Sequence, residues 1–264
     1  MANFTAKDVQ ALRRATGAGM LDCKRALEET GGDIEKAKQW LREQGLAGAA
    51  KRSDREATQG AVALAVSGRN AAIVELRCET DFVAKAESFV NLTDELAQLV
   101  AEQGSQAVAD RSDDIDELKT TLKENISVGQ IARFEMGADS VVGTYLHMQS
   151  GRGVNAVLVE MNGATEELAH DVAVHVAFAR PSYLRREDVP QEEIDAERAT
   201  VEKLSRNEGK PEAALPKIVD GRMNGWFKER CLLEQPYAKD EKRTIAELVG
   251  SAEIVRFAQV VVGG

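Results

Sequence analysis

The first 45 residues carry short apolar stripes separated by breaks, and this pattern predicts three short helices. Thr5 and Asp8 have the spacing of a capping box, so we expect the first helix to begin just after Thr5. Gly17 and Gly19 are expected to end this helix, and the second helix is predicted over Met20–Glu29. Asp33 is a good N-cap for the third helix. The apolar residues at helical spacing are Val9, Leu12, Met20, Cys23, Leu27, Ile34, Ala37 and Leu41.

Each of these predicted helices has an apolar stripe that is too small to be stable alone. We therefore expect them to pack into one module over residues 1–45, near the lower size limit for independent folding. Residues 46–59 are small, polar and charged, which indicates a partly helical linker.

From residue 60 onward, short runs of alternating apolar positions predict strands. The expected strands span residues 61–66, 71–76, 131–135, 141–148, 154–161 and 254–258, and the first two are expected to form a hairpin with a turn over Ser67–Asn70. The expected helices span residues 85–103, 113–125 and 165–179. The order strand, strand, helix and later strand occurs over 60–139 and again over 140–264. We interpret this as an internal duplication of an α+β subdomain with small antiparallel sheets packed against helices.

The second half contains an interruption of about residues 187–229. The stretches 191–206 and 212–229 are charged and favour helices, and the segment 207–211 between them contains Gly and Pro. This is typical of a hairpin of two helices. We expect it to form an arm that serves contacts or oligomerisation.

The charge distribution narrows the range of partners. A formal net charge of −10 argues against a general nucleic-acid binder, which needs a basic surface. Residues 1–55 carry 11 Lys and Arg against 8 Asp and Glu, so a basic N-terminal segment precedes an acidic remainder of the chain. This asymmetry suggests two parts with different contacts.

Neither an N-terminal apolar segment of the signal-peptide kind nor an apolar run of membrane-spanning length is evident in the sequence. The cysteines Cys23, Cys78 and Cys231 are odd in number and far apart, so they indicate neither a disulfide framework nor a metal pair. A reducing cytoplasm is the expected location.

The motifs that resemble catalytic or binding chemistry are weak. Gly17-Ala18-Gly19 resembles a phosphate loop, but Asp22 stands where a dinucleotide fingerprint needs glycine. His170 and His175 lie at i and i+5 of one predicted helix, whereas a zinc pair on a helix needs i and i+4. Cys78 has no histidine near it in the sequence, which favours a buried, inert thiol. We expect no metal and no cofactor.

The segment from Thr80 to Val83 is the clearest candidate site. It is expected to form a loop between a predicted strand end and a predicted helix start, which is a rigid place to present a side chain. Phe82 either fills the core or contacts a partner. Asp81 has no second carboxylate, metal ligand or phosphate loop beside it, so it makes a poor active site. Contact with a partner is therefore the favoured role of this segment.

Three segments resemble the bacterial elongation factor Ts family, whose members exchange guanine nucleotides on elongation factor Tu. They are Thr16-Gly17-Ala18-Gly19-Met20-Leu21-Asp22-Cys23-Lys24, Glu79-Thr80-Asp81-Phe82-Val83-Ala84-Lys85, and Gly221-Arg222-Met223 with Leu233-Glu234-Gln235-Pro236-Tyr237. They occur in the family's order and the resemblance covers essentially the whole chain. In the third segment the chain has Tyr237 where the family pattern has phenylalanine.

The resemblance implies a fold and a set of contacts. The module over 1–45 is expected to be a three-helix fold of the ubiquitin-associated type that docks on elongation factor Tu. The arm is expected to be a coiled-coil protrusion. The segment Thr80–Val83 is expected to insert near the partner's Mg²⁺ and phosphate site, with Phe82 as the intruding aromatic. The other implied contacts are Gly17, Met20, Leu21, His147, Gln235, Pro236 and Tyr237.

The resemblance also implies an activity: binding to elongation factor Tu with GDP, displacement of Mg²⁺, and release of GDP so that GTP can bind. Such a protein is not an enzyme and needs neither nucleic acid nor a membrane. A homodimer through the arm or the core stays open. Some family members continue into a C-terminal helix, and we expect no such contact after Gly264.

Two alternatives to nucleotide exchange remain. One is an enzyme in which Cys78 or Asp81 reacts and His147 acts as the base. The other is an adaptor that holds its partner without changing the partner's affinity for nucleotide.

Overall fold

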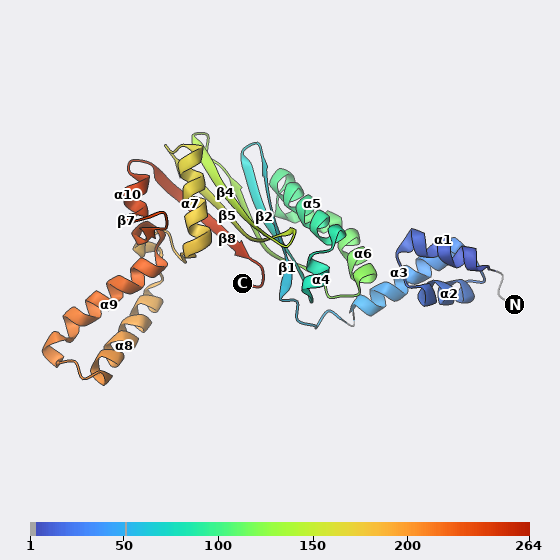
Figure 1. Ribbon diagram of the computed structural model, residues 1–264, viewed down its shortest axis with the longest axis horizontal. Helices are drawn as coiled ribbons and strands as arrows, with labels where there is room; N and C mark the ends of the chain where they lie inside the picture. The colour runs from blue at the N-terminus through green and yellow to red at the C-terminus, as the bar shows by residue number, and fades with distance from the viewer. Residues whose placement is uncertain (1–3, 51) are drawn as a thin grey trace. The chain divides into compact units, whose positions relative to one another are not determined.

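The computed structural model describes residues 4–50 and 52–264 (Figure 1). Its N-terminal helices are α1 (Ala6–Thr16), α2 (Met20–Glu29) and α3 (Ile34–Ala50). The predicted capping box is confirmed, because Asp8 Oδ2 accepts the Thr5 N–H at 2.7 Å. The third helix continues to Ala50, so the beginning of the predicted linker is helical. The buried core of this module is formed by Val9, Leu12, Cys23, Ala26, Leu27, Ala37 and Leu41.

The first sheet has the strand order β1-β2-β3. Strands β1 (Gln59–Ser67) and β2 (Asn70–Cys78) form the predicted antiparallel hairpin, with Ser67 paired to Asn70. The third strand, β3 (Ser127–Glu135), is reached through α4 (Asp81–Ala84), α5 (Glu87–Gln103), a 3-10 segment η1 (Ser105–Arg111) and α6 (Ser112–Leu122). Figure 1 shows α5 lying along this hairpin, and their shared core includes Val74, Leu76, Phe89, Leu96 and Val100.

The second sheet has the order β4-β5-β8. It consists of β4 (Ser140–Gln149), β5 (Arg152–Asn162) and β8 (Glu253–Val261). Helix α7 (Glu166–Ala179) begins at the N-cap Thr165, and its apolar face packs with residues of β5. Between α7 and β8 the chain also forms a small sheet of β6 (Pro236–Tyr237) and β7 (Asp240–Thr244), followed by α10 (Ile245–Val249).

The charged helical stretches form α8 (Gln191–Asn207) and α9 (Leu215–Arg230). They share an apolar cluster that includes Val201, Val219 and Met223. Arg198 Nη1 and Asp220 Oδ1 add an ion pair between them at 2.9 Å. Short 3-10 turns lie at η2 (Arg186–Asp188), η3 (Glu212–Ala214) and η4 (Leu232–Glu234).

Over the described residues the chain divides into two compact units. The first contains the residues up to Arg133 together with Leu146–Asn155 and Val260–Gly264, and the second contains Phe134–Tyr145 and Ala156–Gln259. The mixed α+β class with small sheets is confirmed. The duplication of the core, the ubiquitin-associated type of the first module and the use of the helical pair as an arm stay predictions.

Candidate functional site

The segment after β2 forms a helical turn, where the sequence pattern predicts an irregular loop. Helix α4 contains only Asp81–Ala84. Thr80 is its N-cap with extended backbone, and the Thr80 hydroxyl accepts a hydrogen bond from the Val83 N–H at 3.4 Å. A four-residue helix is too short to be stable by itself, so neighbouring contacts must hold it.

Phe82 projects from this turn into solvent. Its side chain is 82% exposed, while Ala84 is buried and Val83 is half-buried against the core of the first unit. The turn is therefore fixed to the core on one face and presents an aromatic ring on the other. The possibility that Phe82 fills the core of the free protein is wrong. The ring is therefore available for contact with a partner, and aromatic residues are enriched in protein–protein interfaces.

Asp81 is paired within the same turn. The Lys85 ammonium lies 2.5 Å from Asp81 Oδ2, and this hydrogen bond lowers the pKa of the Asp81 carboxyl. Asp81 therefore carries its negative charge at neutral pH. Because its carboxylate is paired with Lys85, the Asp81 side chain contributes to holding the turn.

Glu124, which follows α6, holds the start of this turn and is not among the sequence-predicted site residues. Its Oε2 accepts the N–H groups of Glu79 and Thr80, each at 3.0 Å. Its Oε1 accepts the Thr80 hydroxyl at 2.5 Å. No periodicity or motif pairs residues so far apart in the chain, so only the folded structure finds this contact.

Cys78 has the properties of a structural thiol. Its side chain is fully buried, and its Sγ donates a hydrogen bond to the Thr80 carbonyl oxygen at 3.2 Å. Burial raises the pKa of the thiol to about 12, so it is protonated at neutral pH. This opposes a role as nucleophile. In residues 4–50 and 52–264 no cluster of side chains is suited to hold a metal ion.

The predicted contacts of the N-terminal module lie at the junction of α1 and α2. Gly17 ends α1 with a φ of 67°, a left-handed conformation that favours glycine. The side chains of Met20 and Leu21 are 46% and 79% exposed at the start of α2. The structure thus places two apolar side chains next to each other in solvent, although the helical pattern assigned Met20 to the packed side.

His147 lies on β4 and is exposed, as is Met148 after it. Its position fits the predicted contact role.

The segment Gln235–Tyr237 differs from a simple surface contact. The side chains of Gln235 and Tyr237 are only 4% and 6% exposed, and Pro236 is the exposed member. The Tyr237 hydroxyl donates to Asp171 Oδ2 at 3.0 Å. In the free protein, the buried side chains of Gln235 and Tyr237 therefore hold the segment in place and are not available for contact with a partner.

His175 of α7 completes this buried network. The Ala238 N–H donates to His175 Nδ1 at 3.2 Å, so the proton of the neutral ring resides on Nε2. Nε2 then donates to Gln235 Oε1 at 3.0 Å, and Gln235 Nε2 donates to the Glu229 carbonyl at 2.8 Å. Burial lowers the pKa of His175, which favours this neutral form. His175 is a structural residue.

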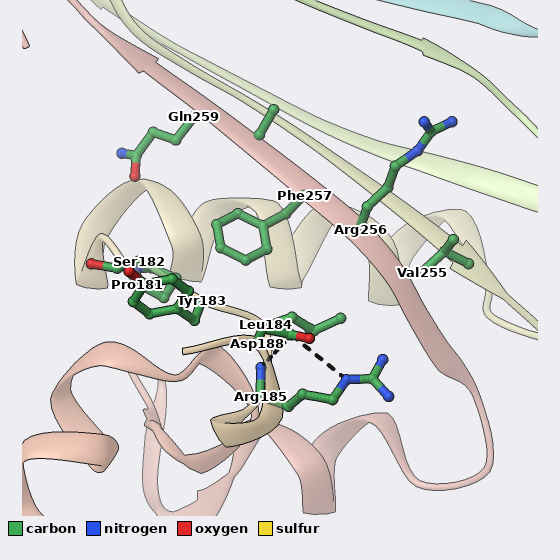
Figure 2. Close-up of a pocket in the computed structure, with 11 residues that line it drawn as sticks. Pro181, Ser182, Tyr183, Leu184, Arg185, Asp188, Val255, Arg256, Phe257 and Gln259 are labelled. Carbon is green, nitrogen blue, oxygen red and sulfur yellow. Dashed lines mark hydrogen bonds and ion pairs between the residues drawn. The ribbon is translucent and has the colours of Figure 1, made fainter. Parts of the chain in front are cut away.

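The second unit also has an open pocket of about 570 Å³ between the 181–188 segment and β8. Figure 2 shows Phe257 over the pocket and Arg185 joined to Asp188. The Arg185 N–H donates to Asp188 Oδ2 at 3.0 Å, and Arg256 pairs with Glu160 at 2.7 Å. These charged groups are already paired and form no acid–base or nucleophile–base arrangement, so the pocket gives no support to a catalytic site.

Across the described ranges, no helix combines the length and apolar character needed to cross a membrane.

Comparison with known proteins places the chain among translation factors. The profile of the family described as Elongation factor TS matches residues 79–264, which includes the Thr80–Val83 turn. The chain is 46% identical over 266 residues to elongation factor Ts of Kineococcus radiotolerans, covering 96% of each protein. It is 44% identical over 277 residues to that of Clavibacter michiganensis, and 43% identical over 284 residues to that of Streptomyces coelicolor. The last two similarities each cover 100% of both proteins.

Proposed function

Because the chain belongs to the elongation factor Ts family, we propose that it is a guanine-nucleotide exchange factor for elongation factor Tu. It binds the GDP-bound partner in translation elongation, promotes the release of GDP, and leaves the nucleotide-free partner open to GTP. The observation that carries the proposal is the exposed Phe82 on a fixed turn, in a chain with this family membership.

Exchange of this kind requires no covalent chemistry. The chain binds nucleotide-free partner more tightly than nucleotide-bound partner, and linkage then weakens nucleotide binding by the same factor. The buried, protonated Cys78 supports this non-enzymatic reading. It opposes the alternative in which Cys78 reacts, and the pairing of Asp81 with Lys85 gives no support to a reacting Asp81.

Phe82 supplies the differential contact. Burying a phenylalanine side chain stabilises a complex by roughly 1.5–3 kcal/mol, and most of the Phe82 ring is exposed before binding. If the ring enters a pocket that exists only when the partner's nucleotide site is open, this free energy favours the open state. Displacement of Mg²⁺ in that state removes the largest positive charge next to the phosphates.

Asp81 and the remaining contacts have supporting roles. The pairing of Asp81 with Lys85 supports a role in holding the turn over one in repelling phosphate. The exposed pair Met20 and Leu21 supports docking of the N-terminal module on the partner, and the basic excess of residues 1–55 assists association. His147 and Pro236 add contacts of the core. The protein acts in the cytoplasm without a cofactor.

The test is the release of fluorescent GDP from purified elongation factor Tu with excess unlabelled GDP. The proposal predicts strong acceleration by the wild-type chain at concentrations well below that of the partner. Binding to the partner without faster release would support the adaptor instead. Hydrolysis or transfer by the chain alone, lost in Cys78→Ser, would support the enzyme.

A further inference from the structure

Glu124 makes an unusual set of contacts for a half-buried glutamate. It follows Lys123, which ends α6 in a left-handed conformation with a φ of 59°. From there its carboxylate reaches back to the end of β2. One oxygen accepts both backbone N–H groups of Glu79 and Thr80, and the other accepts the Thr80 hydroxyl at 2.5 Å. Hydrogen bonds to an ionised acceptor are the stronger class.

These contacts set the direction in which the turn leaves the strand. The Thr80 hydroxyl donates to Glu124 and accepts from the Val83 N–H, so Glu124 orients the cap of α4. The next residue, Asn125, accompanies it: the Asn125 N–H donates to Glu79 Oε1 at 2.7 Å. The segment after α6 therefore holds Glu79 and Thr80 through side-chain and backbone groups.

The exposed ring of Phe82 depends on this arrangement, because α4 has only four residues and no helix length to stabilise it. Without Glu124, the N–H groups of Glu79 and Thr80 lose their acceptor and the Thr80 hydroxyl is free to rotate. The turn then samples several directions, and insertion of Phe82 requires that it be ordered again. A loss of preorganisation of this kind lowers the rate of the step that needs the geometry.

We propose that Glu124 is a positioning residue for nucleotide exchange, which holds the Thr80–Val83 turn so that Phe82 is aimed for insertion into the partner. This inference rests on the proposed exchange function. It adds to that function that a residue outside the turn sets the direction in which Phe82 points. Glu124 acts through Thr80 and needs no contact with the partner.

The experiment measures fluorescent GDP release from elongation factor Tu over a range of chain concentrations. We expect Glu124→Ala to lower the maximal release rate by about tenfold, the factor that corresponds to one lost charge-assisted hydrogen bond. The chain concentration that gives half-maximal release should change much less, because the other contact surfaces remain. Glu124→Gln should recover most of the rate, since its amide oxygen accepts the two N–H groups and its NH₂ donates to the Thr80 hydroxyl.

A double-mutant cycle with Phe82→Ala separates positioning from general stability. If Glu124 acts through the turn, Glu124→Ala changes the rate by less than about twofold once Phe82 is absent. The matched control is Glu95→Ala, which removes a glutamate of α5 that pairs with Arg111 at 2.5 Å. That variant should exchange like the wild type.

The outcomes distinguish this inference from the function on which it rests. No acceleration by the wild-type chain would refute the exchange function and this role with it. Acceleration by the wild type that Glu124→Ala retains in full would overturn only the positioning role. Equal losses with and without Phe82, or a loss in Glu124→Gln as large as in Glu124→Ala, would overturn it as well.

Discussion

The buried imidazole of His175 should make the stability of the second unit depend on pH. In the folded chain, burial lowers the pKa of His175 from its ordinary value of 6.5, and both ring nitrogens already have partners. In the unfolded chain the ring takes up a proton below pH 6.5. Since the unfolded state then binds more protons than the folded state, stability is fully present above pH 6.5 and falls as the pH decreases.

The expected size follows from linkage. One proton bound only in the unfolded state lowers the free energy of unfolding by up to about 1.4 kcal/mol per pH unit. The decrease continues until the pH reaches the lowered folded pKa. Carboxyl groups with lowered pKa values, such as Asp171 and Glu160, act in the same direction at lower pH, near and below the ordinary values of 3.8 and 4.5. The interval from about pH 4.5 to 6.5 therefore reports on His175.

The assay is urea unfolding between pH 4.5 and 7.5 in a Trp40→Phe background, in which Trp226 is the remaining tryptophan and belongs to the second unit. We expect His175→Gln to remove most of the pH slope. The control His170→Gln replaces an exposed histidine on the same helix and should keep it. Equal slopes in wild type and His175→Gln would show that the buried ring is not the source of the pH dependence.

Two further predictions concern packing and thiol chemistry. Leu27→Ala empties a fully buried site and should destabilise the N-terminal module by about 2–5 kcal/mol in chemical denaturation, whereas Leu21→Ala on the same helix should change its stability by under about 0.5 kcal/mol. Equal effects would show that the assigned core of the module is wrong. Burial raises the pKa values of Cys78 and Cys231 to about 12 and about 11, so iodoacetamide at pH 8 should label them slowly in the native chain and rapidly in guanidinium. Fast labelling of native Cys78 would contradict the buried-thiol assignment.

Local signals in the sequence were sufficient for much of the fold. The capping box of Thr5 and the turn between Ser67 and Asn70 depend on neighbouring residues, and both are confirmed. The sequence pattern does not predict helix α4, because four residues are too few to show a period of 3.6, although Thr80 is a good N-cap. Helix α3 continues into the segment 46–59, in agreement with a partly helical linker, although small residues without a clear apolar stripe do not indicate where the helix ends.

The missed parts of the site depend on contacts between distant segments. Glu124 is tied to Thr80 by hydrogen bonds that no spacing rule anticipates. The resemblance implies that Gln235 and Tyr237 contact the partner, but in the free protein the structure buries them against His175 and Asp171. The polar residues that flank Phe82 favour an exposed ring, but only the packing of Val83 and Ala84 against the core determines that the ring points outward.

The role of Phe82 in exchange is tested most directly by GDP release from elongation factor Tu at a saturating concentration of the chain. The rate is compared between wild type, Phe82→Ala and Phe178→Ala. Phe178 lies near the end of α7 and its side chain is 77% exposed, so it is a matched aromatic control. Loss of roughly 1.5–3 kcal/mol of ring burial predicts a decrease of about ten- to a hundredfold for Phe82→Ala, and no change for Phe178→Ala. Full acceleration by Phe82→Ala would contradict the claim that this turn drives exchange.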